Sequence, residues 1–418
     1  MAPMIRPDLN SIPAYVPGAR MPDALKLSSN ESTHPPLPQA VQAMADAAAT
    51  VNRYPDMGVT ELRQALASAL SLPGLENVAV GCGSSALCQQ LVQISCTDGD
   101  EVVFAWRSFE AYPIFAQVVG ATPVPVPLTK DHRHDLPAML DAITDRTRLM
   151  FVCNPNNPTG TTMTRAEFED FMRKVPPQVL VALDEAYMEY IRDVDTPLST
   201  EYLQAFPNLV GLRTFSKAYG LAGARVGYAF SANTEVIDAL NKVALPFGVN
   251  AVAQAGALAS LAVADALLEH TNEVVAERAR IAAAVGGVAS QANFVWVPRD
   301  DAPEIAAHLA DAGVLVRAFP EGLRITATTA EETERLLAAV DAQLVARGLV
   351  LKRGTLIDAS LVEADADVRK GPDGQPVPTL LERDFNLPPL PKIFDELSGI
   401  RTRQARAVPA RATAPETA

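Results

Sequence analysis

The stretch RLMFVCNPNNPTGTTMTRAEFEDFMRKVPPQVLVALDEAY, at residues 148–187, decides the fold of this chain. It begins with one short apolar run, RLMFVC, and ends near another, QVLVALD. Both runs are rich in the Val, Leu and Phe that are typical of strands buried on two faces. Between them, RAEFEDFMRKV places apolar residues at helical spacing. A strand, a helix and a second strand in this order predict an α/β layered domain with a mostly parallel sheet.

The same alternation continues on both sides of this stretch, from about residue 78 to residue 231. EVVFAW and NLVGLR are further strand candidates. Ligands of such sheets bind outside the carboxyl ends of the strands. Asn157, Asp184 and Lys217 each follow an apolar run closely, so we expect these three residues to share one site.

The pattern beyond residue 231 predicts a second, smaller unit. Helix-like segments come first, then the strand-like pieces NFVWVP, VLVRAF and GLRITAT, then an amphipathic helix, EETERLLAAVDAQLVARG. We therefore predict an N-terminal arm (1–34), a large α/β domain (35–234), a small α+β domain (235–348) and a tail (349–418). The tail is Pro-rich or low in complexity, and we predict that it is largely disordered.

The composition excludes several classes of protein. The chain has 418 residues, of which 48% are hydrophobic and 20% are charged, as in globular proteins. A formal net charge of −14 argues against a nucleic-acid partner, which requires clustered Lys and Arg. The four cysteines form no CxxC pair, and His132 and His134 lack an evident third ligand, so we predict no metal site.

We predict a cytoplasmic protein without a membrane span. The start, MAPMIRPDLN, lacks the apolar core of a signal peptide. The most apolar long stretch, residues 247–268, is interrupted by polar residues, and it is more typical of a buried alanine-rich helix than of a membrane span.

Two segments carry small and polar residues suited to binding an anion. GCGSSALCQQL (81–91) follows a strand-like run and opens a helix, where backbone amides and hydroxyls gather. RTFSKAYGLAGARVGYA (213–229) spaces Ser216, Lys217 and Arg225 through a loop of small residues. Each segment alone is also compatible with an ordinary turn between elements.

Taken together, NPNNPTG, DEAY and SKAYGLAGARVGY resemble the fold-type I pyridoxal-phosphate-dependent aminotransferases, in particular the histidinol-phosphate aminotransferase branch. KLSSNES and VNRYPD resemble N-terminal signatures of that branch, and the likeness runs from about residue 6 to about residue 346. The resemblance implies an aspartate-aminotransferase-like fold with pyridoxal 5′-phosphate as the cofactor.

The resemblance also implies roles for individual residues around that cofactor. Lys217 matches the lysine that forms the Schiff base, and Asp184 matches the carboxylate that faces the pyridine nitrogen. Tyr187 and Asn157 match the residues that hold the ring oxygen. Phe109 lies where an aromatic ring stacks on the cofactor. The positions that match phosphate-binding residues are Ser84, Ser85, Ser216 and Arg225.

Further positions concern the substrate and a second subunit. Arg324 matches the arginine that binds the substrate carboxylate, and Asn293 lies at the start of a strand of the same domain. Tyr15 has two open interpretations, because it either lines the substrate pocket or anchors the arm. Tyr54 matches a tyrosine that reaches the cofactor phosphate of a neighbouring subunit, which implies a homodimer with shared sites.

Two substrates remain open within this branch. Many histidinol-phosphate enzymes carry an acidic pair after the glycine turn, where this chain has Ser84, Ser85 and Ala86. The strings around these motifs are more similar to actinobacterial aromatic-amino-acid (phenylalanine) aminotransferases. We therefore favour ping-pong transamination of Phe, Tyr or Trp with 2-oxoglutarate over histidinol-phosphate transamination.

Other activities on the same scaffold are less favoured. A decarboxylase or lyase is compatible with the fold, but Arg324 would hold the carboxylate in place. A protein without turnover is disfavoured by Lys217, Asp184 and Arg225.

Two features depart from the family pattern. Between ERAR (277–280) and SQANF (290–294) the chain is shorter than is usual in the family, so we expect altered packing near Arg324. The tail after about residue 349 has no counterpart in these enzymes, and we predict that truncation near Gly348 leaves activity intact.

Overall fold

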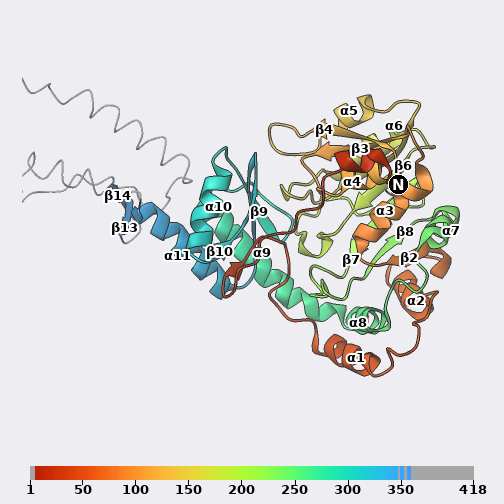
Figure 1. Cartoon of the computed structure of the whole chain (residues 1–418), viewed down its shortest axis with the longest axis horizontal. Helices are drawn as coiled ribbons and strands as arrows, with labels where there is room; N and C mark the ends of the chain where they lie inside the picture. The colour runs from red at the N-terminus through yellow and green to blue at the C-terminus, as the bar shows by residue number, and fades with distance from the viewer. Residues whose placement is uncertain (1–4, 347–348, 353–354, 359–418) are drawn as a thin grey trace, which may run out of the picture.

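The computed structural model describes residues 5–346, 349–352 and 355–358, which form a larger and a smaller part (Figure 1). The larger part is built on a seven-stranded sheet in the order β2-β8-β7-β6-β5-β3-β4, in which β8 alone runs antiparallel to its neighbours. Its strands are β2 (Val78–Gly81), β3 (Glu101–Trp106), β4 (Thr122–Pro127), β5 (Thr147–Cys153), β6 (Leu180–Asp184), β7 (Leu209–Thr214) and β8 (Gly227–Phe230). This architecture confirms the predicted α/β fold with a large, mostly parallel sheet.

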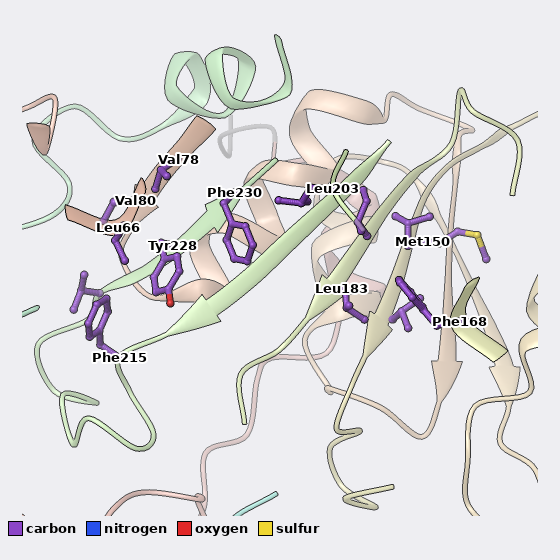
Figure 2. Packing of buried hydrophobic residues seen from close by; sticks show 14 of the residues in the cluster. Leu66, Val78, Val80, Met150, Phe168, Leu183, Leu203, Phe215, Tyr228 and Phe230 are labelled. Carbon is purple, nitrogen blue, oxygen red and sulfur yellow. The ribbon is translucent and has the colours of Figure 1, made fainter. Parts of the chain in front are cut away.

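Helices pack against this sheet, and apolar side chains are buried on both of its faces. Successive residues of β6 point to opposite faces, so that Leu183 joins one apolar cluster and Ala182 joins the other. Phe168, Leu183 and Phe230 belong to the first cluster (Figure 2). The helices of the larger part are α1 (Pro38–Ala48), α2 (Thr60–Ala69), α3 (Ser84–Ser95), α4 (Tyr112–Val118), α5 (Leu136–Asp141), α6 (Arg165–Lys174), α7 (Thr234–Val243) and α8 (Ala251–Ala262).

Helix α6 shows why the predicted helical segments form. Thr164 caps its first turn in a capping box with Glu167, which satisfies amides that have no partner inside the helix. Phe168 and Phe171 are buried on the side that faces the sheet, while the basic Arg173 lies in the last turn, where it complements the helix dipole.

The smaller part is an antiparallel sheet covered by helices. Its strand order is β11-β12-β9, and β1 of the N-terminal arm pairs in parallel with β10 beside it. The elements are β1 (Leu25–Lys26), β9 (Phe294–Pro298), β10 (Val314–Leu315), β11 (Arg317–Phe319), β12 (Gly322–Thr326), α9 (Leu267–Val285), α10 (Ala302–Asp311) and α11 (Ala330–Ala346).

Short 3-10 turns occur along the described chain as a whole: η1 (Pro7–Ser11), η2 (Leu75–Asn77), η3 (Met188–Tyr190), η4 (Ser199–Glu201) and η5 (Ala264–Ala266).

The packing of α7 and α8 bears on the boundary between the two parts. Ile237 of α7 and Ala253 of α8 are buried in the clusters of the large sheet, and Leu267 is the last residue that joins them. We therefore propose that the large domain continues to about Leu267, beyond the predicted boundary at residue 234.

The start of the predicted tail contains a hairpin of β13 (Leu349–Lys352) and β14 (Thr355–Asp358). The rest of the tail, and with it the predicted disorder, lies outside the described residues. Within the described ranges no single helix is long and apolar enough to span a membrane, and α8 reaches that length and composition only together with residues 264–285, at a bend of 78°.

The short connection before β9 is a tight turn. Helix α9 ends at Val285, and Gly286 adopts a left-handed conformation with φ 67°, which is accessible to glycine at little cost. The Val288 amide then donates to the Trp296 carbonyl at 2.8 Å. A β carbon on Gly287 would lie 2.1 Å from a methyl group of Val295, so the close approach requires glycine.

Candidate active site

A cavity of about 440 Å³ lies at the carboxyl edge of the large sheet, a size common for small-molecule sites. The connections that follow β2, β3, β5, β6 and β7 supply most of its wall, as expected for a mostly parallel sheet. Eleven of the predicted site residues line it: Tyr15, Ser84, Ser85, Phe109, Asn157, Asp184, Tyr187, Ser216, Lys217, Arg225 and Arg324. Tyr54 and Asn293 lie outside this cavity wall.

Asp184, at the end of β6, is a buried carboxylate with one oxygen engaged. Its Oδ2 accepts a hydrogen bond of 2.6 Å from the hydroxyl of Tyr112, whose ring stacks on Phe151 at 4.3 Å. Its Oδ1 is buried and has no hydrogen-bond partner among the described residues. Burial raises the pKa of Asp184 to about 6, although the Tyr112 hydrogen bond opposes the shift. The site therefore presents a carboxylate oxygen that is ready to face a cationic or protonated group.

Lys217 lies three residues beyond β7 and points into the same cavity. Its Nζ donates to the Ser29 carbonyl at 3.3 Å and lies 5.7 Å from the centre of the Tyr187 ring. Burial and the nearby Arg324 guanidinium lower its pKa to about 8. An amine with this pKa is unprotonated in roughly one molecule in ten at pH 7, far more than an ordinary lysine, which suits a nucleophile or a general base.

An anion-binding cradle forms where α3 begins. The Arg225 guanidinium donates to the hydroxyls of Ser85, at 3.2 Å, and Ser216, at 3.3 Å. Ser84 is the first residue of α3, where free backbone amides and the helix dipole favour an anion. Gly83 has a positive φ of 80°, which favours glycine, and a β carbon there would lie 2.3 Å from the Arg225 guanidinium. The cradle suits a phosphate group.

Arg324, on β12, also lines the cavity and donates hydrogen bonds only to neutral oxygens. It donates to Asn157 Oδ1 at 2.5 Å and to the Ser28 carbonyl at 2.6 Å. Because Asn157 accepts through its oxygen, its amide nitrogen is left to donate into the cavity. No ion pair to Arg324 occurs among residues 5–341, so its charge is available to a ligand carboxylate.

Three consecutive residues of the N-terminal arm hold the principal side chains. The Ser28 carbonyl accepts from Arg324, the Ser29 carbonyl accepts from Lys217, and Asn30 Nδ2 donates to the Tyr187 hydroxyl at 3.1 Å. Asn293 donates to the Asn30 carbonyl at 3.2 Å, so it lies behind the arm and not on the cavity surface. Its direct contact with substrate stays a prediction.

The remaining aromatic positions differ in exposure. Phe109 lines the cavity and makes an edge contact with Tyr112 at 5.4 Å. Tyr15 also lines the cavity and is 54% exposed. Tyr54 is 82% exposed, and it stacks on Phe247 at 4.5 Å without reaching the cavity of its own chain. The role of Tyr54 toward a neighbouring subunit stays a prediction.

The sequence reasoning missed several residues that complete the site. Tyr112 had no assigned role, yet its hydroxyl donates to Asp184, which lies 72 residues away along the chain. Asn30 belongs to the KLSSNES string but had no assigned role. Glu110 and Arg317 both line the cavity and pair with each other, and nothing local in the sequence indicates that contact.

Comparisons with known proteins agree with this geometry. A family model described as aminotransferase class I and II matches residues 22–340. A curated relative from Corynebacterium diphtheriae, named aromatic amino acid aminotransferase, is 69% identical over 343 residues, covering 81% of this chain and 99% of the relative. A relative of the same name from Rhodococcus jostii is 58% identical over 346 residues, covering 81% of this chain and 95% of the relative.

Solved structures show the same fold. A histidinol-phosphate aminotransferase from Sinorhizobium meliloti, in complex with pyridoxal-5′-phosphate, matches with a TM-score of 0.72 at 30% identity, covering 78% of this chain and 92% of that chain. An aspartate aminotransferase from Thermus thermophilus matches with a TM-score of 0.67 at 24% identity, covering 76% of this chain and 91% of that chain. The resemblance predicted from the motifs is confirmed, and the chain belongs to the aminotransferase class I and II family.

Proposed function

We propose that this protein transfers the amino group of aromatic amino acids (Phe, Tyr and Trp) to 2-oxoglutarate, with pyridoxal 5′-phosphate as the cofactor. The observation that carries the proposal is a single cavity that brings together Lys217, Asp184 and Arg324. A lysine amine can react with the cofactor aldehyde, and a buried carboxylate can face the ring nitrogen. A guanidinium without an ion-pair partner among residues 5–341 can bind an amino-acid carboxylate. In this family the transfer proceeds by a ping-pong mechanism.

The residues present fit pyridoxal phosphate. Asp184 Oδ1 is buried without a protein partner in the described part of the chain, as expected of an oxygen that would face the pyridine nitrogen. The cradle at the start of α3 fits the phosphate, because the Arg225 guanidinium and the hydroxyls of Ser85 and Ser216 meet there. The cofactor would therefore be held by Ser84, Ser85, Phe109, Asn157, Asp184, Tyr187, Ser216, Lys217 and Arg225.

When bound, pyridoxal phosphate supplies an electron-withdrawing ring that stabilises negative charge on the α carbon of an amino acid. Lys217 Nζ then has the role of moving the proton at that α carbon, for which a pKa lowered to about 8 is suitable. Asp184 holds a proton on the ring nitrogen, and Tyr112 orients Asp184 through the 2.6 Å hydrogen bond. Arg324 binds the substrate carboxylate through the planar fork of its guanidinium.

Aromatic substrates are supported by the apolar part of the cavity wall. Tyr15, Phe109, Ile114 and Phe115 line it, and burial of a phenyl ring against such groups is worth roughly 2–3 kcal/mol. Relatives named aromatic amino acid aminotransferase reach 69% identity, whereas the histidinol-phosphate aminotransferase structure above is 30% identical.

The assembly we propose is a homodimer with shared sites in the cytoplasm. Tyr54, Met57 and Leu245 are exposed apolar residues, and Phe247 stacks on Tyr54. Gly248 follows Phe247 of this patch, and its carbonyl accepts from Cys82 Sγ at 2.9 Å. Cys82 directly precedes Gly83 of the phosphate cradle, so the patch adjoins the cradle. A second copy packed on the patch would bring Tyr54 toward its neighbour's cradle. All four cysteines lie within the described residues and are free, which is common in a reducing compartment.

A transamination assay of the cofactor-loaded protein tests the proposed function. Phenylalanine, tyrosine and histidinol phosphate are compared as donors to 2-oxoglutarate, with Lys217→Ala as the inactive control. We expect the aromatic donors to exceed histidinol phosphate in kcat/KM by about ten-fold or more, which corresponds to roughly 1.4 kcal/mol. A higher kcat/KM for histidinol phosphate would assign the enzyme to that substrate instead.

A further inference from the structure

Two arginines lie side by side at the end of the cavity where Arg324 is proposed to bind the substrate carboxylate. Arg317 of β11 and Arg324 of β12 are direct partners across the antiparallel pair, and both line the cavity. Like charges directly opposite each other across two strands are unfavourable. Uncompensated, the pair would present two positive charges to the same end of a ligand.

Glu110 neutralises one of these charges. Its Oε2 lies 2.9 Å from the guanidinium of Arg317, and the two side chains are 31% and 17% exposed. Glu110 belongs to the loop between β3 and α4 and also lines the cavity. Arg324 is bonded to neutral oxygens, so one positive charge at this end of the cavity stays without a carboxylate partner among the described residues.

A second arginine–glutamate ion pair, Arg107 with Glu321, lies near the first one but outside the cavity wall. Phe319 has three guanidiniums within 6 Å of its ring centre, those of Arg107, Arg317 and Arg324, at 5.5, 5.6 and 5.8 Å. Arg107 is bonded twice to Glu321, at 2.9 Å each, and neither residue belongs to the cavity wall. The Arg107–Glu321 pair therefore serves as a matched control for the Arg317–Glu110 pair. Both arginines lie near the Phe319 ring and pair with a glutamate, but only Arg317 and Glu110 line the cavity.

We propose that Glu110 determines substrate specificity by neutralising Arg317, so that the cavity selects ligands with one negative charge at the Arg324 end over ligands with two. A carboxylate carries one negative charge, whereas a phosphate monoester carries about 1.5 to 2 near pH 7. In histidinol phosphate a phosphate ester takes the place of the α-carboxylate of an amino acid. The pair thus gives a physical reason for preferring amino acids to that substrate. The inference rests on the proposed function, which it deepens.

Equilibrium binding of two inert ligands tests the inference without relying on turnover. The probes are 3-phenylpropanoate, a monoanion, and 2-phenylethyl phosphate, mostly a dianion at pH 7.5. Their dissociation constants are measured by calorimetry on the cofactor-loaded protein. We expect the wild-type protein to prefer the monoanion, and Glu110→Gln to shift the ratio of the two constants toward the dianion by about ten-fold.

Three further variants separate specificity from structure. Glu110→Asp keeps the charge and should keep a ratio near that of the wild type. Glu110→Gln combined with Arg317→Gln should abolish the shift, because no second positive charge remains. Glu321→Gln frees Arg107 outside the cavity and should leave the ratio unchanged.

The inference is overturned if Glu110→Gln leaves the ratio unchanged, or if both dissociation constants change by the same factor. A thermal melt of each variant identifies loss of folding. If Glu110→Gln does not fold, Glu110→Ala replaces it and should shift the ratio in the same direction. Failure of the proposed function is a distinct result. If phenylalanine is not turned over but the ratio shifts as expected, the charge selection stands while the aromatic assignment fails.

Discussion

At the scale of single residues, Asp184 combines burial with a negative charge. Its pKa is raised to about 6 because burial disfavours the charged form by more than the Tyr112 hydroxyl stabilises it. A carboxyl whose folded pKa lies above its ordinary value of 3.8 binds its proton more tightly in the folded state. Ionisation of Asp184 therefore costs stability above about pH 6, and this cost fades as the pH falls toward 4.

We predict that Asp184→Asn of the cofactor-free protein gains stability relative to the wild type as the pH rises from 4 to 8. The gain should be on the order of 2–3 kcal/mol, because the variant has no charge to bury while Asn still accepts from Tyr112. Denaturant unfolding at several pH values measures it. A difference in stability that does not change with pH would contradict the prediction. The same variant should lose transamination activity, because it no longer holds a proton on the ring nitrogen.

The sequence revealed only part of the site at this scale. Lys217, Asp184 and Asn157 could be singled out because each follows an apolar strand run, and the motifs around them are contiguous in sequence. Tyr112 and Glu110 could not, because their partners lie 72 and 207 residues away. Periodicity and turn chemistry describe neighbours along the chain, and they do not state which distant side chains meet in space.

At the scale of elements, the contact between α3 and β8 positions the cradle. A β carbon on Gly227 would lie 2.3 Å from the Ser84 amide nitrogen, so a larger residue would push the start of α3 away from the sheet. The cradle residues Ser85 and Arg225 lie on the two sides of this contact.

We predict that Gly227→Ala lowers the free energy of unfolding by about 1–3 kcal/mol and weakens the binding of pyridoxal phosphate. Gly223→Ala is the matched control, since a β carbon there meets no atom within 4 Å. Unfolding curves and a titration of the cofactor-free protein with pyridoxal phosphate measure the two effects. Equal behaviour of both variants would show that the close approach of α3 is not required.

The strands of the sheet were largely predictable, and their order was not. The runs that predicted strands near residues 101–106, 148–153, 178–184 and 208–213 correspond to β3, β5, β6 and β7. An apolar run indicates burial but does not name the neighbouring strand. The antiparallel insertion of β8 between β2 and β7 was therefore not foreseen. The helices α7 and α8 were placed in the small domain because their local pattern changes there, although their apolar faces pack on the large sheet.

At the scale of the whole molecule, the cavity is assembled from the arm and both parts of the chain. Tyr15 and Asn30 come from the arm, Lys217 from the larger part and Arg324 from the smaller part. Every residue of the cavity wall lies between Tyr15 and Arg324.

We predict that removal of residues 349–418 leaves transamination activity within about two-fold of the full chain, because no wall residue is removed. Parallel measurement of kcat/KM for phenylalanine on both proteins tests this. A large loss of activity in the shortened chain, with its fold retained by circular dichroism, would assign the tail a role in the site.

The shared sites of the proposed dimer lead to a complementation test. Lys217→Ala and Tyr54→Ala should each be inactive or nearly so as homodimers. Co-expression should restore about a quarter of the wild-type activity, because half of randomly paired dimers are hybrids with one intact site. Hybrids without activity, or a fully active Tyr54→Ala protein, would show that each chain forms its site alone.

The N-terminal arm has a consequence for how the site can be observed. The Leu27 amide donates to the Leu315 carbonyl at 2.7 Å, and its own carbonyl accepts from Thr326 at 3.0 Å. The next three residues hold Arg324, Lys217 and Tyr187. The arm therefore cannot detach without releasing all three side chains at once. The rate of deuterium uptake at the Leu27 amide therefore reports how often the site opens. A ligand that binds Arg324 or Lys217 should slow this uptake.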